Sequence, residues 1–203
     1  MCKQRGNVFL FSGPSGSGKD TILKQIFARY PDLKFSISST TRAWREPSDD
    51  EKYNFLTNEE FEAGIAADGF LEYAEYCGKY YGTPAAPIEQ WRNEGYDVVI
   101  ECEVQGALQI MEKLPDLTSV FIIPPSIEVL RKRLTGRQTE SAEQTEKRIQ
   151  TAMAEMQFAD RYEYLVINDR LEDAVDLVSH IIDSQHAKVI NNTKFLSEVL
   201  QNA

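Results

Sequence analysis

A glycine-rich turn between an apolar run and an amphipathic segment constrains this chain more than any other feature. The turn fits the pattern G-x-x-x-x-G-K, and its residues are Gly13, Pro14, Ser15, Gly16, Ser17, Gly18 and Lys19. It follows the apolar run 8–11 and precedes a helically spaced apolar stripe that ends at Pro31. Glycines let backbone N–H groups turn toward phosphate oxygens, while the helix N-terminus and the lysine add positive charge. The arrangement predicts a phosphate-binding loop on an α/β fold. The alternative is a plain glycine-rich turn with an exposed lysine.

Three further apolar runs have the length and character of the first. They cover 97–100, 120–123 and 164–167. Because they are too apolar to alternate, they favour parallel strands that are covered on both faces. Helical spacing of apolar residues recurs over 104–113, 126–134 and 141–159. Strands that alternate with helices predict an α/β fold with a doubly wound parallel sheet.

The segment 37–90 interrupts this alternation. It contains short aromatic strand candidates at 53–55, 70–74 and 79–82 around one helix near 58–67. This composition predicts a small inserted α+β subdomain. We therefore expect a single domain over 1–203, with a core made of 1–36 and 91–183.

The segment 184–203 forms a C-terminal extension with its own pattern. Its apolar residues recur at helical spacing and are Val189, Ile190, Phe195, Leu196, Val199 and Leu200. This pattern predicts an amphipathic helix that packs onto its own domain. A contact in a homodimer is the alternative.

Charge and cysteine content restrict the partners and the compartment. The chain has 22 basic and 32 acidic residues, a formal charge of −10, which disfavours nucleic acid and anionic membranes. Residues 1–48 nevertheless carry eight Lys or Arg against three acidic residues, a net charge of +5, so we expect an anionic ligand there. Three cysteines without C-x-x-C spacing predict neither a disulfide framework nor a zinc site. With no membrane-spanning apolar window and no secretory leader, we expect a cytoplasmic protein.

Several linked motifs narrow the function further. They are S-I-S-S-T-T-R-A-W-R at 36–45, Y-N-F at 53–55, F-L-E-Y-A at 70–74, Y-Y-G-T-P at 80–84 and V-Q-G-A at 104–107. Together with the phosphate loop they resemble, in order and spacing, the guanylate kinases, which are P-loop nucleoside monophosphate kinases. The resemblance runs from about residue 8 to about residue 182. It implies a P-loop NTPase core, a GMP-binding subdomain at 37–90, a helical lid at 134–150 and transfer of phosphate from ATP to GMP with Mg²⁺.

The resemblance also implies which residues bind the acceptor. The residues that match the family's GMP site are Ser38, Arg42, Arg45, Tyr53, Glu72, Tyr81, Thr83 and Glu103. Arginines can clamp a phosphate bidentately, and a carboxylate can accept hydrogen bonds from the N1–H and amine of guanine. For Glu72 alone, without the linked motifs, an exposed strand acid is the default interpretation.

ATP and the transition state are expected to use a second set of residues. The resemblance implies ATP contacts from the loop 13–19 and from Asp20, Thr21, Arg133 and Asn168. It implies catalytic charge neutralisation by Lys19, Arg42, Arg137 and Arg148. Surface ion pairs are the alternative for the lid arginines.

Two acids depart from the family pattern. Asp20 stands where Ser or Thr usually coordinates the metal, and Glu103 stands where bacterial members often have Asp. We expect Asp20 and Glu101 to assist Mg²⁺ through its water shell, and the alternative for Asp20 is that it only caps the helix. Glu101 and Glu103 are two residues apart at a strand end, so they share a face opposite Cys102.

Two other functions share this fold. The sequence Gly-Lys-Asp at the end of the loop also resembles ribose 1,5-bisphosphate kinases, which lack the Tyr-Tyr-Gly-Thr and Gln-Gly-Ala motifs found here. A guanylate-kinase-like module that binds phosphopeptides without ATP is the non-enzymatic alternative. The intact loop 13–19 and the lid arginines argue against it.

Overall fold

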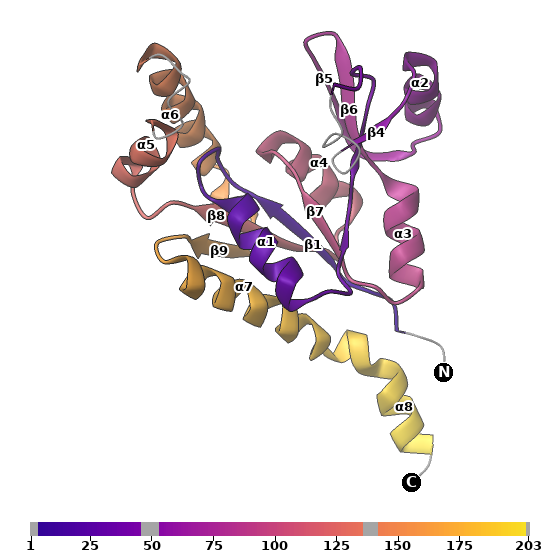
Figure 1. Cartoon of the computed structure of the whole chain (residues 1–203). Coiled ribbons are helices and arrows are strands. Elements are labelled where there is room, and N and C mark those ends of the chain that lie inside the picture. Colours follow the sequence, from indigo (N-terminus) through magenta and orange to yellow (C-terminus); the bar gives the residue numbers. More distant parts are fainter. Residues whose placement is uncertain (1–3, 46–52, 136–141, 202–203) are drawn as a thin grey trace.

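The central element of the structure is a five-stranded parallel sheet (Figure 1). The computed structural model describes residues 4–45, 53–135 and 142–201. The strands lie in the order β2 (Lys34–Phe35), β7 (Val98–Glu101), β1 (Val8–Ser12), β8 (Thr118–Ile123) and β9 (Tyr164–Ile167). All of the pairs are parallel. The predicted doubly wound α/β fold is confirmed.

Helices cover both faces of this sheet, as the uninterrupted apolar strands predict. On one face, α1 (Lys19–Arg29) and α7 (Leu171–His186) pack against alternate side chains such as Phe9 and Phe11. On the other face, α3 (Ala85–Asn93) and α4 (Val104–Lys113) pack against Val8 and Leu10. β1 is buried along its whole length, and so are β7 and β8 except for their last residues, whereas Leu165 and Ile167 of the edge strand β9 are exposed.

Because the strands are parallel, their carboxyl ends meet at one edge of the sheet. Phe11 of β1 pairs with Glu101 of β7, and Ser12 pairs with Phe121 of β8. From β1 the chain runs to β2 and β7 on one side of β1 and then crosses to β8 and β9 on the other side, so β1 lies at a switch point in strand order. Ligands of open α/β sheets bind at this kind of edge.

A second, four-stranded sheet lies beside the core (Figure 1). Its order is β4 (Tyr53–Phe55), β3 (Ser38–Thr40), β6 (Lys79–Pro84) and β5 (Phe70–Tyr76). Cys77 and Gly78, both with positive φ, form the two-residue turn between β5 and β6. Helix α2 (Asn58–Ala66) packs on this sheet and begins with a capping box of Thr57 and Glu60. The predicted strands and helix of the insertion are found here, while β2, β3 and α3 were not predicted.

The remaining helices form a lobe and a tail. Helices α5 (Ile127–Thr135) and α6 (Ala142–Met156) share a small core of Leu130, Leu134, Ile149 and Ala152. After α7, the short η3 (Val189–Asn192) leads into α8 (Thr193–Gln201). The predicted tail helix is present, but its apolar side chains are exposed rather than packed onto the domain. Among the described residues, none of the helices has the length and hydropathy needed to cross a bilayer.

The small sheet depends on one aromatic stack. Phe61 of α2 is fully buried, with ring centroids 4.3 Å from Phe70 and 5.1 Å from Tyr80. We expect Phe61→Ala to lower the free energy of unfolding by about 3 kcal/mol because it leaves a cavity between two rings. Urea unfolding measures this effect. Tyr76→Ala, at a largely exposed aromatic residue of β5, is the control and should change stability by less than about 0.5 kcal/mol. Equal losses in the two variants would contradict the prediction.

Candidate active site

The loop between β1 and α1 has the backbone conformation that phosphate binding requires. Gly13 has φ +138° and lies against the backbone of Ile122, so a side chain there would overlap β8. Gly18 has φ +91° and caps the N-terminus of α1. The ammonium of Lys19 turns back and donates to the carbonyl of Gly13 at 2.8 Å. The glycine-rich backbone, the N-terminus of α1 and the ammonium of Lys19 therefore lie together, as a binding site for a phosphate group requires.

Two residues from segments distant in the sequence hold this loop in place through hydrogen bonds to a loop carbonyl. Asn168, just after β9, donates from Nδ2 to the carbonyl of Ser17 at 2.8 Å. Arg133 of α5 donates to the same carbonyl at 3.1 Å and to the carbonyl of Asn168 at 2.8 Å. Both residues were predicted to contact ATP. In the structure they brace the loop that would hold its phosphates.

Carboxylates gather on the opposite side of the loop. A cavity of about 290 Å³ is lined by the loop residues and Asp20, Glu101, Cys102, Glu103 and Glu155. Lys19 Nζ lies 4.0 Å from Glu101 Oε1. Burial raises the pKa of Glu101, and the nearby Asp20 raises it further while Lys19 opposes the shift. These oxygens are the ligand type that Mg²⁺ prefers, and a cation would offset their desolvation.

Glu155 is a candidate residue that sequence reasoning missed. It lies on α6, and its spacing in the sequence is that of an ordinary helix-surface acid. In the structure it lines the same cavity as Lys19 and Glu103. Burial raises its pKa, Glu103 raises it further, and Lys19 lowers it. Only the packing of α6 beside the phosphate loop reveals this position.

A second cavity, of about 650 Å³, opens toward the small sheet. Four of the predicted acceptor residues line it directly with Glu103, and these are Ser38, Tyr53, Glu72 and Tyr81. Thr83 reaches it through Glu72, because its hydroxyl donates to Glu72 Oε1 at 2.7 Å. Glu72 is 8% exposed, which excludes an exposed strand acid. Burial raises its pKa, and the hydrogen bonds from Thr83 oppose the shift.

Gly106 gives Glu72 the space to enter this cavity. A Cβ on Gly106 would lie 2.9 Å from Glu72 Oε2 and 2.5 Å from Cys102 Sγ. Both neighbours are held in place, Glu72 by Thr83 and Cys102 by its position at the end of β7. The sequence motif contained Gly106, but only the structure gives the reason for a glycine.

Two of the predicted arginines contact residues that line the cavities. The guanidinium of Arg42 stacks over the ring of Tyr53 at 5.0 Å and over Phe55 at 5.7 Å. Tyr53 in turn lies 6.0 Å from Tyr81. Arg148 of α6 donates to the hydroxyl of Ser15 at 2.6 Å, which links α6 to the phosphate loop.

The remaining predicted residues are either exposed or not described. Thr21 is exposed on α1, and Arg45 is exposed at the end of the described segment 4–45. Arg137 lies outside the described residues. The structure thus brings together the loop, the acids at the end of β7 and most of the predicted acceptor residues.

A phosphate loop at the switch point of a parallel sheet, with a second cavity that shares the wall made by Glu101, Cys102 and Glu103, defines a P-loop nucleotide-binding protein. Comparisons with known proteins specify the family. The family model "Guanylate kinase" matches residues 5–185. Guanylate kinase of Lactococcus lactis is 46% identical over 188 residues, which is 92% of each chain. Guanylate kinase of Oceanobacillus iheyensis is 42% identical over 203 residues, which is 100% of this chain and 98% of the other.

Structural similarity agrees with the sequence comparisons. The crystal structure of guanylate kinase from Anaplasma phagocytophilum superposes with a TM-score of 0.69 at 28% identity. The match covers 92% of this chain and 89% of the other. The chain belongs to the guanylate kinase family.

The buried Glu72 carboxylate is expected to cost stability in the protein without ligand. Its raised pKa means that protonation favours the folded state, so this contribution is lost as pH rises through the folded-state pKa. Glu72→Gln removes the charge and keeps an acceptor for Thr83. We expect it to raise the free energy of unfolding by about 1 kcal/mol near pH 8 and to have little effect near pH 4.

Urea unfolding at the two pH values measures this difference. Glu75→Gln, at an exposed acid of the same strand, is the matched control and should leave stability unchanged at both. A destabilised Glu72→Gln protein at the higher pH would contradict the prediction.

Proposed function

We propose that this chain transfers the γ-phosphoryl group of ATP to GMP, giving ADP and GDP. The observation that carries this proposal is the shared wall of the two cavities. Glu101, Cys102 and Glu103 at the end of β7 line both the phosphate-loop cavity and the cavity that holds Glu72. A donor phosphate on the loop and an acceptor in the second cavity would therefore meet across this strand end.

Recognition of the acceptor base would depend on Glu72. Its carboxylate accepts from the N1–H and the 2-amine of guanine, a pair of donors that adenine lacks. Ser38 and Thr83 add hydroxyl contacts, and Glu103 faces the base and ribose. Because burial raises the pKa of Glu72, the two guanine donors stabilise the charged form and offset part of its desolvation.

The acceptor phosphate would lie against the arginines and tyrosines of the same cavity. Arg42 is already oriented by its contact with Tyr53, which lowers the cost of fixing its guanidinium on binding. Arg45, Tyr53 and Tyr81 complete the proposed clamp. A bidentate arginine fixes both the position and the direction of the attacking oxygen.

ATP would bind with its phosphates on the loop 13–19, assisted by Asp20 and Thr21 at the start of α1. Arg133 and Asn168 support the loop through the carbonyl of Ser17, and we expect them to contact the bound ATP. Asp20 and Glu101 supply carboxylate oxygens suited to Mg²⁺, and they would hold it through its water shell. The ion supplies positive charge to the ATP phosphates.

Catalysis would consist of positioning and charge neutralisation. An oxygen of the GMP phosphate attacks the γ-phosphorus in line, the bond to the bridging oxygen breaks, and ADP leaves. Lys19, Arg42, Arg137 and Arg148 neutralise the charge on the transferring group. Closure of the lid at 134–150 and of the GMP subdomain at 37–90 excludes water.

We place this activity in a reducing, cytoplasmic compartment. Cys77 and Cys102 are free thiols, which is the usual state of cysteines there.

The choice of acceptor tests the proposed function. We expect ADP formation from MgATP with GMP and much less with AMP, UMP, dTMP or ribose 1,5-bisphosphate. Lys19→Met should lower the rate about 10³-fold because it removes charge at the transferred phosphate. Lys132→Met, at an exposed lysine outside both cavities, is the control and should retain the rate. Turnover of the sugar phosphate, or none with any acceptor, would refute the GMP kinase assignment.

Gly106 provides a test of the acceptor site alone. We expect Gly106→Ala to raise the KM for GMP between about tenfold and a hundredfold, because the added Cβ displaces the Glu72 carboxylate. The KM for ATP should change little. Gln109→Ala, at an exposed position of the same helix, is the control. An unchanged KM for GMP in the Gly106 variant would show that Glu72 is not held as described.

A further inference from the structure

Helix α6 brings two charged side chains to the phosphate loop. Arg148 and Glu155 are seven residues apart on this helix, which is about two turns, so they lie on the same face. Arg148 donates to the hydroxyl of Ser15. Glu155 lines the cavity that Ser15 and Lys19 also line. One face of α6 therefore presents a cation and a carboxylate to the place where the donor phosphates would bind.

The carboxylate of Glu155 is partly buried, and no hydrogen bond from the described residues reaches it. Its charged neighbours are Glu103, which repels it, and Lys19, which attracts it. Lys19 also serves other groups, because its ammonium donates to the carbonyl of Gly13 at 2.8 Å and lies 4.0 Å from Glu101. Glu155 therefore adds a negative charge that the protein compensates only in part.

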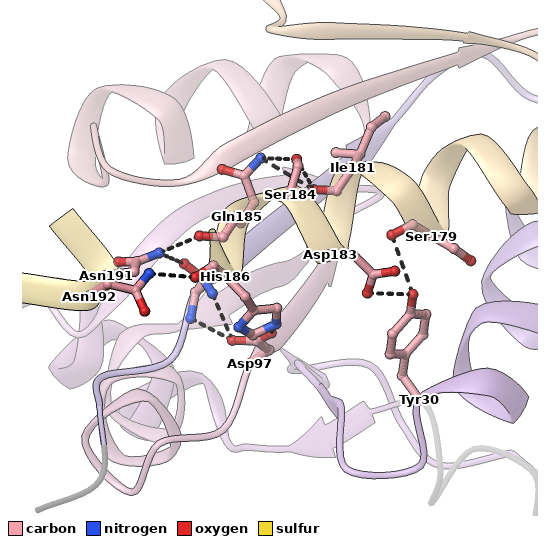
Figure 2. Close-up of polar contacts among 11 residues, drawn as sticks. Tyr30, Asp97, Ser179, Ile181, Asp183, Ser184, Gln185, His186, Asn191 and Asn192 are labelled. Atoms are coloured by element: carbon pink, nitrogen blue, oxygen red, sulfur yellow. Dashed lines mark hydrogen bonds and ion pairs between the residues drawn. The ribbon is translucent and has the colours of Figure 1, made fainter. Parts of the chain in front are cut away.

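A carboxylate at the opposite edge of the sheet shows how the fold otherwise compensates such a group. Asp97 lies just before β7, at its amino end, and Figure 2 shows it beside His186. Its Oδ1 accepts from the backbone N–H of Asn7 at 2.7 Å, and its Oδ2 lies 2.9 Å from His186 Nε2. A buried acid without such donors is costly. The lack of donors at Glu155 is thus a feature of the phosphate-loop cavity.

The lining of this cavity holds more negative than positive groups. Lys19 supplies an ammonium, and carboxyl groups come from Asp20, Glu101, Glu103 and Glu155. A triphosphate on the loop would add further negative charge, and repulsion between charges is stronger in a partly buried cavity than in water. The repulsion is smaller when the triphosphate carries a divalent cation. The lining therefore favours the metal complex of a nucleotide over the free nucleotide.

Glu155 is the acid of this lining that has no other assigned task. Asp20 and Glu101 are proposed to hold Mg²⁺, and Glu103 also lines the cavity that holds Glu72, whereas Glu155 does not. We propose that Glu155 is a specificity residue of the donor site, whose charge disfavours a nucleoside triphosphate without metal and so selects its Mg²⁺ complex. This inference rests on the proposed function, which places ATP on the loop.

The affinity for ATP with and without the metal tests this proposal. We expect the unaltered chain, titrated with ATP in the absence of an acceptor, to bind more tightly in excess Mg²⁺ than in EDTA. Glu155→Gln should bind metal-free ATP about tenfold more tightly, because one negative charge leaves the cavity, and bind the Mg²⁺ complex within about twofold of the unaltered chain. Glu155→Asp keeps the charge and should keep the preference for the complex.

Two controls separate this effect from a change of net charge. Glu143→Gln removes an exposed acid of the same helix, and Asp183→Asn removes an acid of α7 that accepts a hydrogen bond from Tyr30 (Figure 2). Both should retain the full preference for the Mg²⁺ complex.

Two results for Glu155→Gln would overturn the proposal. One is an unchanged preference, and the other is an equal loss of affinity for both forms of ATP, which a displaced α6 would cause. An unaltered chain that binds ATP under neither condition would instead refute the proposed function, and this inference with it.

Discussion

The carbonyl of Ser17 is the point on which the candidate site depends. It accepts hydrogen bonds from Asn168 after β9 and from Arg133 on α5, so two segments more than a hundred residues away hold the phosphate loop. The N–H of Ser17 in turn donates to the carbonyl of Pro14 at 3.1 Å, so both backbone polar groups of this residue are bonded within the protein. The parallel sheet supplies the geometry, because β1, β7 and β9 all end at the same edge. A loop of the same sequence without these neighbours would lack this preorganisation.

The carboxylates at the carboxyl edge of the sheet make the site acidic, and their burial also lowers the stability of the fold. Burial raises the pKa of both Glu72 and Glu101, so each carboxylate is partly desolvated before any ligand arrives. Lys19 compensates Glu101 only in part, at 4.0 Å, and Thr83 compensates Glu72 through its hydroxyl and its backbone N–H. In the proposed function, a cation and the guanine donors would compensate these carboxylates. Binding and selectivity would then come from the same groups that cost the free protein stability.

The sequence predicted the strands and helices that have a local periodic pattern of apolar residues. It did not predict the short strands that exist only because a neighbouring strand pairs with them. The four apolar runs are strands β1, β7, β8 and β9, and the helical spacings are helices, since each pattern carries its own periodicity. The two residues of β2 and the three of β3 are strands only because neighbours pair with them. Amphipathic spacing correctly predicted a helix in the tail, but it does not say what covers the apolar side.

The sequence by itself determined the phosphate loop and the alternation of strands and helices, and it predicted the acceptor residues. These follow from glycine conformation, from periodicity and from linked motifs along the chain. Only the tertiary structure decided that Glu72 is buried against Thr83, that Gly106 makes room for it and that Glu155 faces Lys19. The reason is physical, because burial and proximity between distant residues depend on how the sheets and helices pack. No local pattern contains that information.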